Sequence, residues 1–290
     1  MLWGWGYIYI FLCPSVSHTG DSSYTVMKIL IVFALCHIHH ITGSPANGLS
    51  GEPLKQLAPQ HKTEVDGIPK DCQEIWDRNH HTSDVYIIYP QGAQRPLPVY
   101  CDMTTNGTPW TVFQRRLDGS VDFQKPWLDY VNGFGNADGE YWLGLQNIYL
   151  LTVDSDCELR VDLEDCAGRR VSALYSNFSL SRNALNPESD GYRLYVGAVT
   201  DGGAGDALAP HVEHMFSTFD KDQDEEVQNC AEYWGGGFWY HAGGCAGAGL
   251  NARYKATGPL QNAFSWTPWV EYPETLRASQ MKMRRVPDSN

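Results

Sequence analysis

The sequence predicts an α+β fold in which antiparallel strands and short helices are followed by a loop-rich C-terminal region. Three observations support this prediction. Runs of β-branched and aromatic residues, some alternating with polar ones, occupy much of residues 84–180, as expected of strands. Two stretches between residues 127 and 151 carry apolar residues at helical spacing instead. After Gly191 the chain is rich in glycine and aromatic residues without regular pattern, which indicates a region built from loops.

The elements are expected in a definite order from Lys70 onward. Strands are predicted over residues 84–90, 97–103, 110–116 and 158–165, and residues 170–180 are expected to complete a hairpin with the last of these. Helices are predicted over residues 127–130 and 142–151, with turns at residues 133–135 and 138–140 between them.

Composition limits the class of protein. Of the 290 residues, 42% are hydrophobic and 12% are aromatic, which provides a packed core and excludes disorder over most of the length. The formal net charge of -13 argues against nucleic-acid binding, since that function needs a basic surface. The same charge is compatible with an extracellular protein that holds calcium.

Eight cysteines, none in a CxxC pair, indicate disulfides and an oxidising compartment rather than a zinc ribbon or a thioredoxin-like motif. Cys72 and Cys101 are expected to bridge the first small sheet, and two separate buried thiols are the alternative. Cys157 and Cys166 flank a predicted strand that would hold them roughly 30 Å apart, too far for a mutual disulfide. We expect both to be buried or partly buried thiols, or to form an intermolecular bond.

The first 68 residues are expected to lie outside the folded domain. Residues 1–26 are interpreted as an upstream extension, because Met27-Lys28 opens a better-formed signal peptide over residues 27–44. The apolar core of that peptide is too short to span a bilayer, which takes about 20 residues, so the chain is not expected to be membrane-spanning. Residues 45–68 form a predicted flexible tail without a heptad repeat or collagen triplets.

Three alternating aspartates, Asp220, Asp222 and Asp224, stand shortly before Cys230. Alternate carboxylates on a tight loop can turn toward one point, which suits a hard cation that prefers oxygen ligands. A solvated acidic loop beside a disulfide is the alternative. An EF-hand is excluded, because counting from Asp220 puts Glu225 where the loop needs glycine and Ala231 where it needs a bidentate glutamate.

Five separated motifs together resemble the fibrinogen C-terminal-like domain family over about residues 69–286. They are Cys101–Thr105 (CDMTT), Trp110–Gln114 (WTVFQ), Gly133–Gly135 (GFG), Gly139–Leu145 (GEYWLGL) and Phe216–Ala231. The resemblance implies a non-enzymatic, calcium-dependent recognition domain with a central twisted, mainly antiparallel sheet and short helices. It also implies three subdomains: residues 69–115, residues 116–196, and a loop-rich calcium and ligand subdomain over residues 197–286.

The resemblance assigns the calcium ligands. It implies that the carboxylates of Asp222 and Asp224 bind Ca²⁺ together with the backbone carbonyls of Glu226 and Gln228. Asp220 would then shape the loop instead of binding the ion. Two carboxylates indicate modest affinity, with a dissociation constant on the order of 10⁻⁴ to 10⁻³ M.

The resemblance also implies a ligand pocket beside a Cys230–Cys245 disulfide. Aromatic residues would form a cup for an acetyl methyl group, backbone amides would bind the acetyl oxygen, and a cis peptide would precede Cys245. The residues implied are Phe238, Trp239, Tyr240 and Tyr254 for the cup, and Cys245 and Ala246 for the amides. The chain departs from the family pattern here: residues 242–244 lengthen the loop, and Ala246 replaces the usual histidine. Packing alone is the alternative role for residues 238–240.

Two N-glycosylation sequons, Asn106-Gly107-Thr108 and Asn177-Phe178-Ser179, fall on predicted turn and strand-edge segments. They agree with a secreted glycoprotein.

The function predicted from these features is that of a secreted recognition glycoprotein of the extracellular matrix or innate immunity. It would bind acetylated carbohydrates or matrix proteins of the elastin, fibrillin or collagen type, as a homo-oligomer because a single weak site needs avidity. A structural elastic-fibre-associated protein without sugar recognition is the alternative. A hydrolase is disfavoured, since the chain has no GxSxG, HExxH or P-loop motif. An Arg-Gly-Asp integrin motif is also absent, and Val65-Asp66-Gly67 is its nearest counterpart.

Overall fold

The computed structural model describes residues 67–90, 95–245, 247–254, 264–270 and 275–286. All of them belong to one compact unit. The predicted upstream extension, signal peptide and nearly all of the predicted tail lie outside the described residues.

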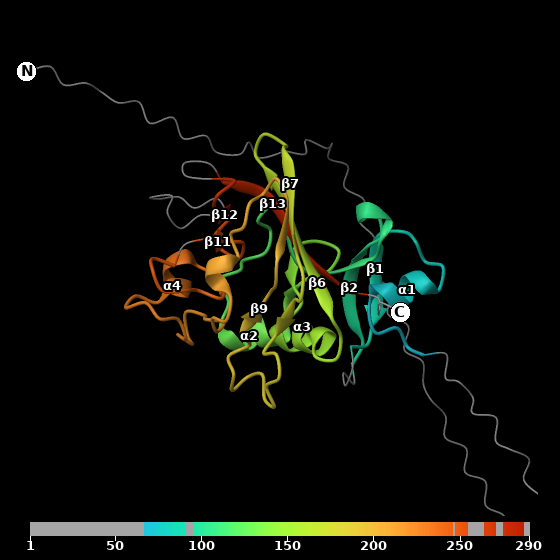
Figure 1. The fold of residues 1–290 in the computed structure, drawn as a ribbon, viewed down its shortest axis with the longest axis horizontal. Helices are drawn as coiled ribbons and strands as arrows, with labels where there is room; N and C mark the ends of the chain where they lie inside the picture. The colour runs from blue at the N-terminus through green and yellow to red at the C-terminus, as the bar shows by residue number, and fades with distance from the viewer. Residues whose placement is uncertain (1–66, 91–94, 246, 255–263, 271–274, 287–290) are drawn as a thin grey trace, which may run out of the picture. The chain divides into compact units, whose positions relative to one another are not determined.

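A nine-stranded sheet forms the centre of the fold (Figure 1). Its main order is β1 (Asp84–Ile88), β2 (Leu97–Asp102), β3 (Trp110–Arg116), β13 (Leu276–Arg285), β6 (Cys157–Asp165), β7 (Arg170–Tyr175) and β10 (Val199–Gly202). The two short strands β4 (Phe134–Gly135) and β5 (Tyr141–Trp142) pair with each other, and β5 joins β3. Every one of these strand pairs is antiparallel, so the predicted α+β class with a mainly antiparallel sheet is confirmed.

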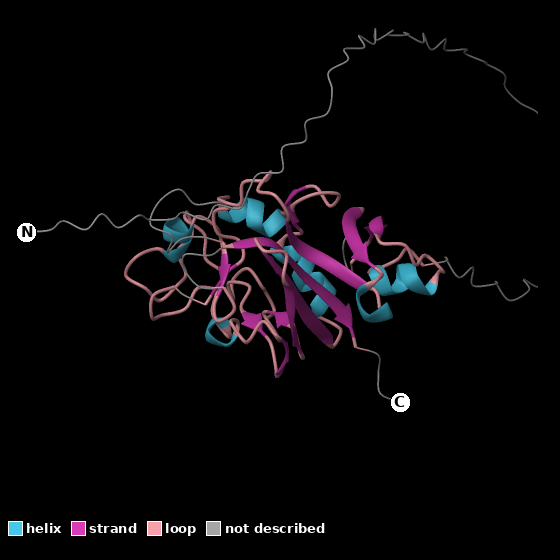
Figure 2. Cartoon of the chain, turned by 90° about the horizontal axis from the view of Figure 1, so that it is seen from above, coloured by secondary structure: helices cyan, strands magenta, loops and turns pink. Residues whose placement is uncertain are grey.

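Short helices and loops account for the rest. The helices are α1 (Cys72–Asp77), α2 (Trp127–Asn132), α3 (Leu145–Thr152) and α4 (Cys230–Trp234), with 3₁₀ turns η1 (Thr105–Gly107) and η2 (Ala209–His211). Two further strand pairs join β8 (Ser179–Leu180) to β9 (Leu194–Tyr195) and β11 (Ala248–Gly249) to β12 (Ser265–Trp266). Loops predominate around α4, as Figure 2 shows.

Three local predictions need correction. The helix predicted from residue 142 begins at Leu145, because Gly144 at φ 104° breaks the chain direction and Trp142 pairs with Gln114 in the sheet. Residues 134–135, predicted as part of a turn, form β4. The hairpin strand predicted over residues 170–180 ends at Tyr175, and Ser179–Leu180 pairs with β9 instead. In each case strand pairing decides the local structure, through a nearby partner for β4 and more distant ones for Trp142 and β8.

The strand β13 occupies the middle of the sheet, although the sequence analysis did not predict it. Four of its ten residues are basic, a composition that is typical of an exposed segment. Each basic side chain pairs with an acid from another part of the chain: Arg277 with Glu164, Lys282 with Asp102, Arg284 with Glu158, and Arg285 with Asp71. Because the partners lie 113 to 214 residues away, no local pattern reveals the strand.

Lys282 shows how far this pairing goes. Its side chain is 1% exposed, and its ammonium group lies 2.6 Å from Asp102 and also contacts Asp162. The Thr105 hydroxyl completes the set at 2.8 Å. Burial would raise the pKa of Asp102, but the charge and hydrogen bond of Lys282 outweigh it and hold that pKa well below its usual range.

The residues of β6 alternate between buried and half-buried positions, and its buried face belongs to the same hydrophobic core as an aromatic cluster. The cluster joins the sheet to the loop region. Trp142 lies 5.7 Å from Phe216 and 6.2 Å from Trp239 between ring centroids, and Phe216 lies 5.0 Å from Trp239. The C-terminal loops are therefore built on the core of the sheet.

The cysteines divide into bonded and free. The predicted Cys72–Cys101 and Cys230–Cys245 disulfides are both present, with Cα atoms 5.5 and 5.6 Å apart. Cys157 is a buried free thiol, so it does not pair with Cys166, as predicted. The expectation of a buried or partly buried thiol at Cys166 was wrong: this residue is exposed at the β6–β7 turn and is disulfide-bonded.

Candidate functional site

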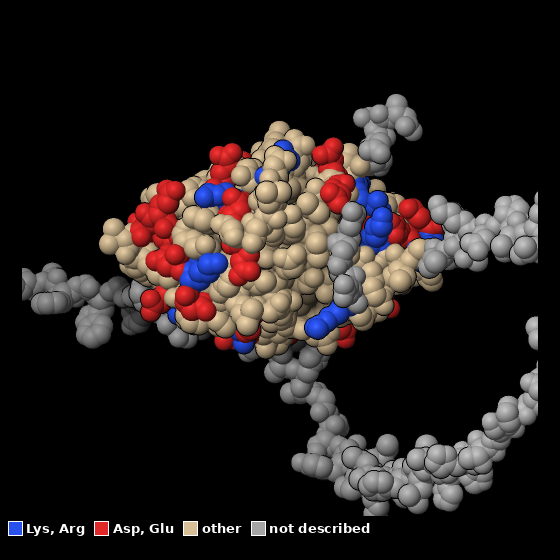
Figure 3. Space-filling model, turned by 90° about the horizontal axis from the view of Figure 1, so that it is seen from below, with Lys and Arg blue, Asp and Glu red and all other residues tan. Residues whose placement is uncertain are grey.

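Acidic side chains crowd the end of the domain at which α4 lies, seen on the left of Figure 3. Asp220 is committed to the shape of the loop there. Its carboxylate accepts hydrogen bonds from the Trp127 amide at 2.8 Å and from the Thr218 hydroxyl at 2.7 Å. The first of these bonds satisfies a backbone amide at the start of α2. This geometry agrees with the loop-shaping role expected of Asp220.

Asp222 and Asp224 form an adjacent pair of carboxylates. The Asp224 amide lies 3.3 Å from Asp222 Oδ1, and Asp224 itself accepts the amides of Glu226 and Cys230, each at 3.0 Å. Partial burial and the negative charge of Asp222 raise the pKa of Asp224, against the lowering effect of those amides. A bound cation would relieve this repulsion. The ammonium of Lys221 lies over the Trp127 ring, 3.7 Å from its centroid.

The chemistry of this donor set fits calcium. Within the described ranges, no cluster of three or more His, Cys, Asp or Glu side chains is arranged to hold a metal. The expected set does not require one, because it combines two carboxylates with the backbone carbonyls of Glu226 and Gln228. Oxygen donors of this kind, completed by water, suit Ca²⁺ better than a transition metal. Calcium would supply positive charge that orders the loop.

The aromatic residues expected to form a cup are interior in this structure. Phe238, Trp239 and Tyr240 are each at most 1% exposed. The Trp239 indole donates to the Tyr192 carbonyl at 2.7 Å, and the Tyr240 hydroxyl donates to the Gly236 carbonyl at 2.6 Å. Their side chains form the wall behind the loop, as the packing alternative describes, and expose no open aromatic face.

The other expected pocket residues lie in different surroundings. The Tyr254 hydroxyl lies within hydrogen-bond distance of the Leu117 and Arg277 carbonyls, and its ring lies 5.6 Å from that of Phe264. Cys245 has φ 59°, and the cis peptide expected before it was wrong: Gly244–Cys245 is trans, whereas Thr267–Pro268 is cis. Ala246 lies outside the described residues.

His211 is a site residue that sequence reasoning missed. Its Nδ1 lies 2.7 Å from the Trp239 carbonyl, and its Nε2 accepts the Ala248 amide at 3.0 Å. The neutral ring with its proton on Nδ1 satisfies both bonds. Burial lowers the pKa of His211 to about 3. A Cβ on Gly247 would lie 2.5 Å from Nε2, so glycine is required there. A lone histidine carries no sequence signal of this role.

Side chains from β3 hold the segment after Ala248. Arg116 donates to the carbonyls of Leu250 and Ala252 at 3.1 and 3.0 Å. Gln114 donates to the Leu250 carbonyl at 2.9 Å and to the side chain of Asn251 at 3.2 Å. All three side chains are buried, so the central sheet fixes the position of the loop subdomain.

Glu226 links the two loops of the candidate site. Its Oε1 accepts the Gly244 amide at 2.8 Å and also the Gly243 amide. These two bonds lower the pKa of Glu226. The family resemblance implied a backbone role for Glu226 but not this side-chain contact, because Gly243 and Gly244 lie 17 and 18 residues further along the chain.

The two sequon asparagines are accessible. Asn106 lies in η1 and Asn177 lies between β7 and β8, and both are exposed with φ near 55°. The geometry is compatible with the glycosylation that the sequence predicts at both positions.

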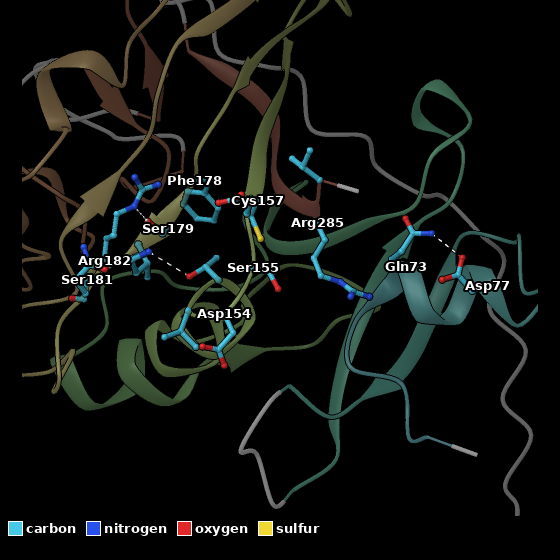
Figure 4. A pocket seen from close by; sticks show the side chains of 16 residues that line it. Gln73, Asp77, Asp154, Ser155, Cys157, Phe178, Ser179, Ser181, Arg182 and Arg285 are labelled. Atoms are coloured by element: carbon cyan, nitrogen blue, oxygen red, sulfur yellow. Dashed lines mark hydrogen bonds between the residues drawn. The ribbon is translucent and has the colours of Figure 1, made fainter. Parts of the chain in front are cut away.

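A separate hollow of about 930 Å³ lies between α1, the turn after α3, and β8 (Figure 4). Figure 1 places α1 at the other end of the domain from α4. The two arginines that line the hollow are hydrogen-bonded within the protein. Arg285 binds Asp71, and Arg182 binds the Asn177 carbonyl and the Ser179 hydroxyl. The candidate calcium loop is therefore remote from this hollow.

The fold and these loops define a fibrinogen-related domain. A family model described as "Fibrinogen beta and gamma chains, C-terminal globular domain" matches residues 68–286, and the chain belongs to this family. The chain is 47% identical over 243 residues to microfibril-associated glycoprotein 4 of Mus musculus, covering 83% of this chain and 91% of the relative. The Homo sapiens protein of the same name is 46% identical over 242 residues, with coverage of 83% and 91%. Residues 102–105, 160–165 and 201–206 indicate this relationship within the family, and the identities confirm it.

Solved structures show the same fold. The fibrinogen-like globe domain of human ANGPTL6 matches with a TM-score of 0.70 and 41% identity, over 76% of this chain and 96% of that chain. Lamprey fibrin D-dimer, complexed with the peptide ligand Gly-His-Arg-Pro-amide, matches with a TM-score of 0.66 and 31% identity, over 81% of each chain. In the part of the chain that the structure describes, no helix has the length and apolar character needed to cross a membrane.

Proposed function

We propose that this chain is a secreted, calcium-dependent recognition glycoprotein of the extracellular matrix or of innate immunity, without enzymatic activity. The observation that carries the proposal is the adjacent Asp222 and Asp224 carboxylates beside the disulfide-closed Cys230–Cys245 loop. The name of its relatives, microfibril-associated glycoprotein 4, supports matrix proteins as partners. Two disulfides support an oxidising compartment.

In this proposal the protein binds acetylated glycans or matrix fibre proteins through the loops around Cys245, and a homo-oligomer supplies avidity. Calcium bound by Asp222 and Asp224 would order the loop that leads into α4 and perform no chemistry. The backbone amides of the loop, backed by the buried wall of Phe238, Trp239 and Tyr240, would donate to the ligand.

Calcium is expected to raise the melting temperature by about 2–6 °C at about 2 mM, for a dissociation constant on the order of 10⁻⁴ to 10⁻³ M. The Asp222→Asn and Asp224→Asn variants should lose this shift, because each removes a proposed ligand charge. Glu225→Gln, which removes a charge from the same loop, is the matched control and should keep the shift. Equal melting of the unmodified chain in calcium and in chelator, followed by differential scanning fluorimetry, would contradict calcium binding.

A structural elastic-fibre-associated protein without sugar recognition is the second candidate. The specific observation in its favour is that the aromatic trio exposes no face to an acetyl group. The two functions differ on an acetylated resin. Recognition of acetyl groups predicts retention in calcium and release by chelator or by free N-acetylglucosamine. Passage through the resin in calcium, by a protein that still shows the calcium-dependent melting shift, would favour the structural role.

A further inference from the structure

We infer that the side chain of Glu226 is a positioning residue that couples the calcium loop to the recognition loop. Its carboxylate holds the amides of Gly243 and Gly244, so that ordering the calcium loop also orders the segment that leads into Cys245. The inference rests on the proposed function for the identity of the cation. It adds a route by which the cation acts on recognition.

The geometry of the glycine pair suits an anion. Gly243 and Gly244 both have φ 103°, and both of their amides converge on Glu226 Oε1. Successive amides aimed at one point form a small anion-binding nest, and hydrogen bonds to a charged acceptor are stronger than neutral ones. An added Cβ at Gly244 would meet no atom within 4 Å, so the backbone conformation, and not space, favours glycine there.

The contacts form a closed ring that includes Asp224, one of the proposed calcium ligands. Asp224 accepts the amides of both Glu226 and Cys230. Cys230 is bonded to Cys245, which follows Gly244 directly. The ring is closed by the hydrogen bonds from the Gly243 and Gly244 amides to Glu226, which lies in the calcium loop two residues beyond Asp224. A change in the position of the Asp224 carboxylate is therefore transmitted to the recognition loop through both a covalent and a charged connection.

The charged connection is the one that calcium can control. Glu226 lies on an exposed loop, where water competes for the Gly243 and Gly244 amides and where holding the long side chain costs conformational entropy. Calcium that binds the Glu226 carbonyl would fix the backbone and remove part of that cost. The contact should then be stronger in calcium than in chelator.

Hydrogen exchange on the secreted protein tests the coupling directly. In the unmodified chain, the Gly243 and Gly244 amides should exchange about tenfold more slowly in calcium than in chelator, a change that corresponds to one net hydrogen bond. In Glu226→Ala they should exchange rapidly in both conditions. Glu226→Gln, which keeps an oxygen acceptor but no charge, should lie between. Glu225→Gln is the matched control and should behave like the unmodified chain.

The calcium-dependent melting shift distinguishes calcium binding itself from the coupling through Glu226. Glu226→Ala should keep the calcium-dependent shift, because its calcium ligand is the backbone carbonyl. Unchanged exchange at Gly243 and Gly244 in Glu226→Ala, with the shift present, would overturn the coupling alone. Loss of the shift in Glu226→Ala would also overturn it, because the side chain would then be needed for calcium binding itself. Absence of the shift in the unmodified chain would instead refute the proposed calcium dependence.

Discussion

Glu140→Ala is expected to lower the free energy of unfolding by about 3–5 kcal/mol, the cost of removing one partner from a buried charged network. Glu140 is 1% exposed. Its carboxylate accepts four amides: those of Leu117, Asp118 and Gly119 on one oxygen and that of Val121 on the other. Removal leaves these donors of a partly exposed turn without their acceptor, and it leaves the buried Arg116 guanidinium without its counter-charge.

The same substitution should reach the candidate site. Glu140 lies 3.9 Å from Arg116, whose guanidinium holds the carbonyls of Leu250 and Ala252. Burial lowers the pKa of Arg116, and the charge of Glu140 opposes that effect. Removal of Glu140 would therefore leave the Arg116 charge buried without a partner. We therefore expect weakened order around Leu250 in the variant.

Urea unfolding measures the effect of Glu140→Ala. Glu158→Ala is the matched control, since Glu158 pairs with Arg284 nearer the surface and should cost about 0–1 kcal/mol. Glu140→Gln preserves the shape and should fall between the two, which keeps the test usable if the alanine variant does not fold. A Glu140→Ala protein as stable as Glu158→Ala would show that the carboxylate does not organise this turn.

Stability should fall as the pH drops from about 6.5 toward about 3, in part because of His211. The folded pKa of His211 is about 3, below the ordinary value of 6.5, because burial disfavours its charged form. Between these values the unfolded chain binds more protons than the folded one, so unfolding gains up to about 1.4 kcal/mol per pH unit from this residue. The rings of His241, 5.1 Å away, and of His214 add repulsion when they are charged.

His211→Gln tests this pH dependence. A glutamine amide can donate to the Trp239 carbonyl and accept the Ala248 amide without titrating. Its melting temperature should decline less than that of the unmodified chain between pH 6.5 and pH 4. Exposed His80→Gln is the matched control and should follow the unmodified chain. Identical pH profiles for His211→Gln and the unmodified chain would show that His211 is not the residue that lowers stability in acid.

The sequence could predict features whose cause is local. Strands β1, β2, β3 and β6 were predicted nearly to the residue, because each pairs β-branched or alternating residues with clear turn signals. Alternation drew attention to the acidic loop, the family resemblance implied Asp222 and Asp224 as its calcium ligands, and that assignment stays a prediction. The Cys72–Cys101 and Cys230–Cys245 disulfides were also identified, the first from its place at a small sheet and the second through the family resemblance.

Prediction failed where distant partners decide the structure. Strand β13 looks like a polar surface segment until Glu164, Asp102, Glu158 and Asp71 supply its counter-charges. The sequence did not reveal that Trp239 is buried. It also did not reveal that the Trp239 carbonyl is hydrogen-bonded to the ring of His211. Cys166 was misjudged because strand alternation says nothing about a residue that falls just beyond the end of β6.

The sequence alone therefore determined the family, the order of most elements and the acidic loop. It also determined the Cys230–Cys245 disulfide, which closes the loop next to the acidic one. Only the tertiary structure decided how those loops are held: by Arg116 and Gln114 from the sheet, by His211 from behind, and by Glu226 across the disulfide. The physical reason is that a carboxylate or imidazole gains a fixed role only when the groups that satisfy it are brought within hydrogen-bond distance, and folding, not sequence spacing, sets those distances.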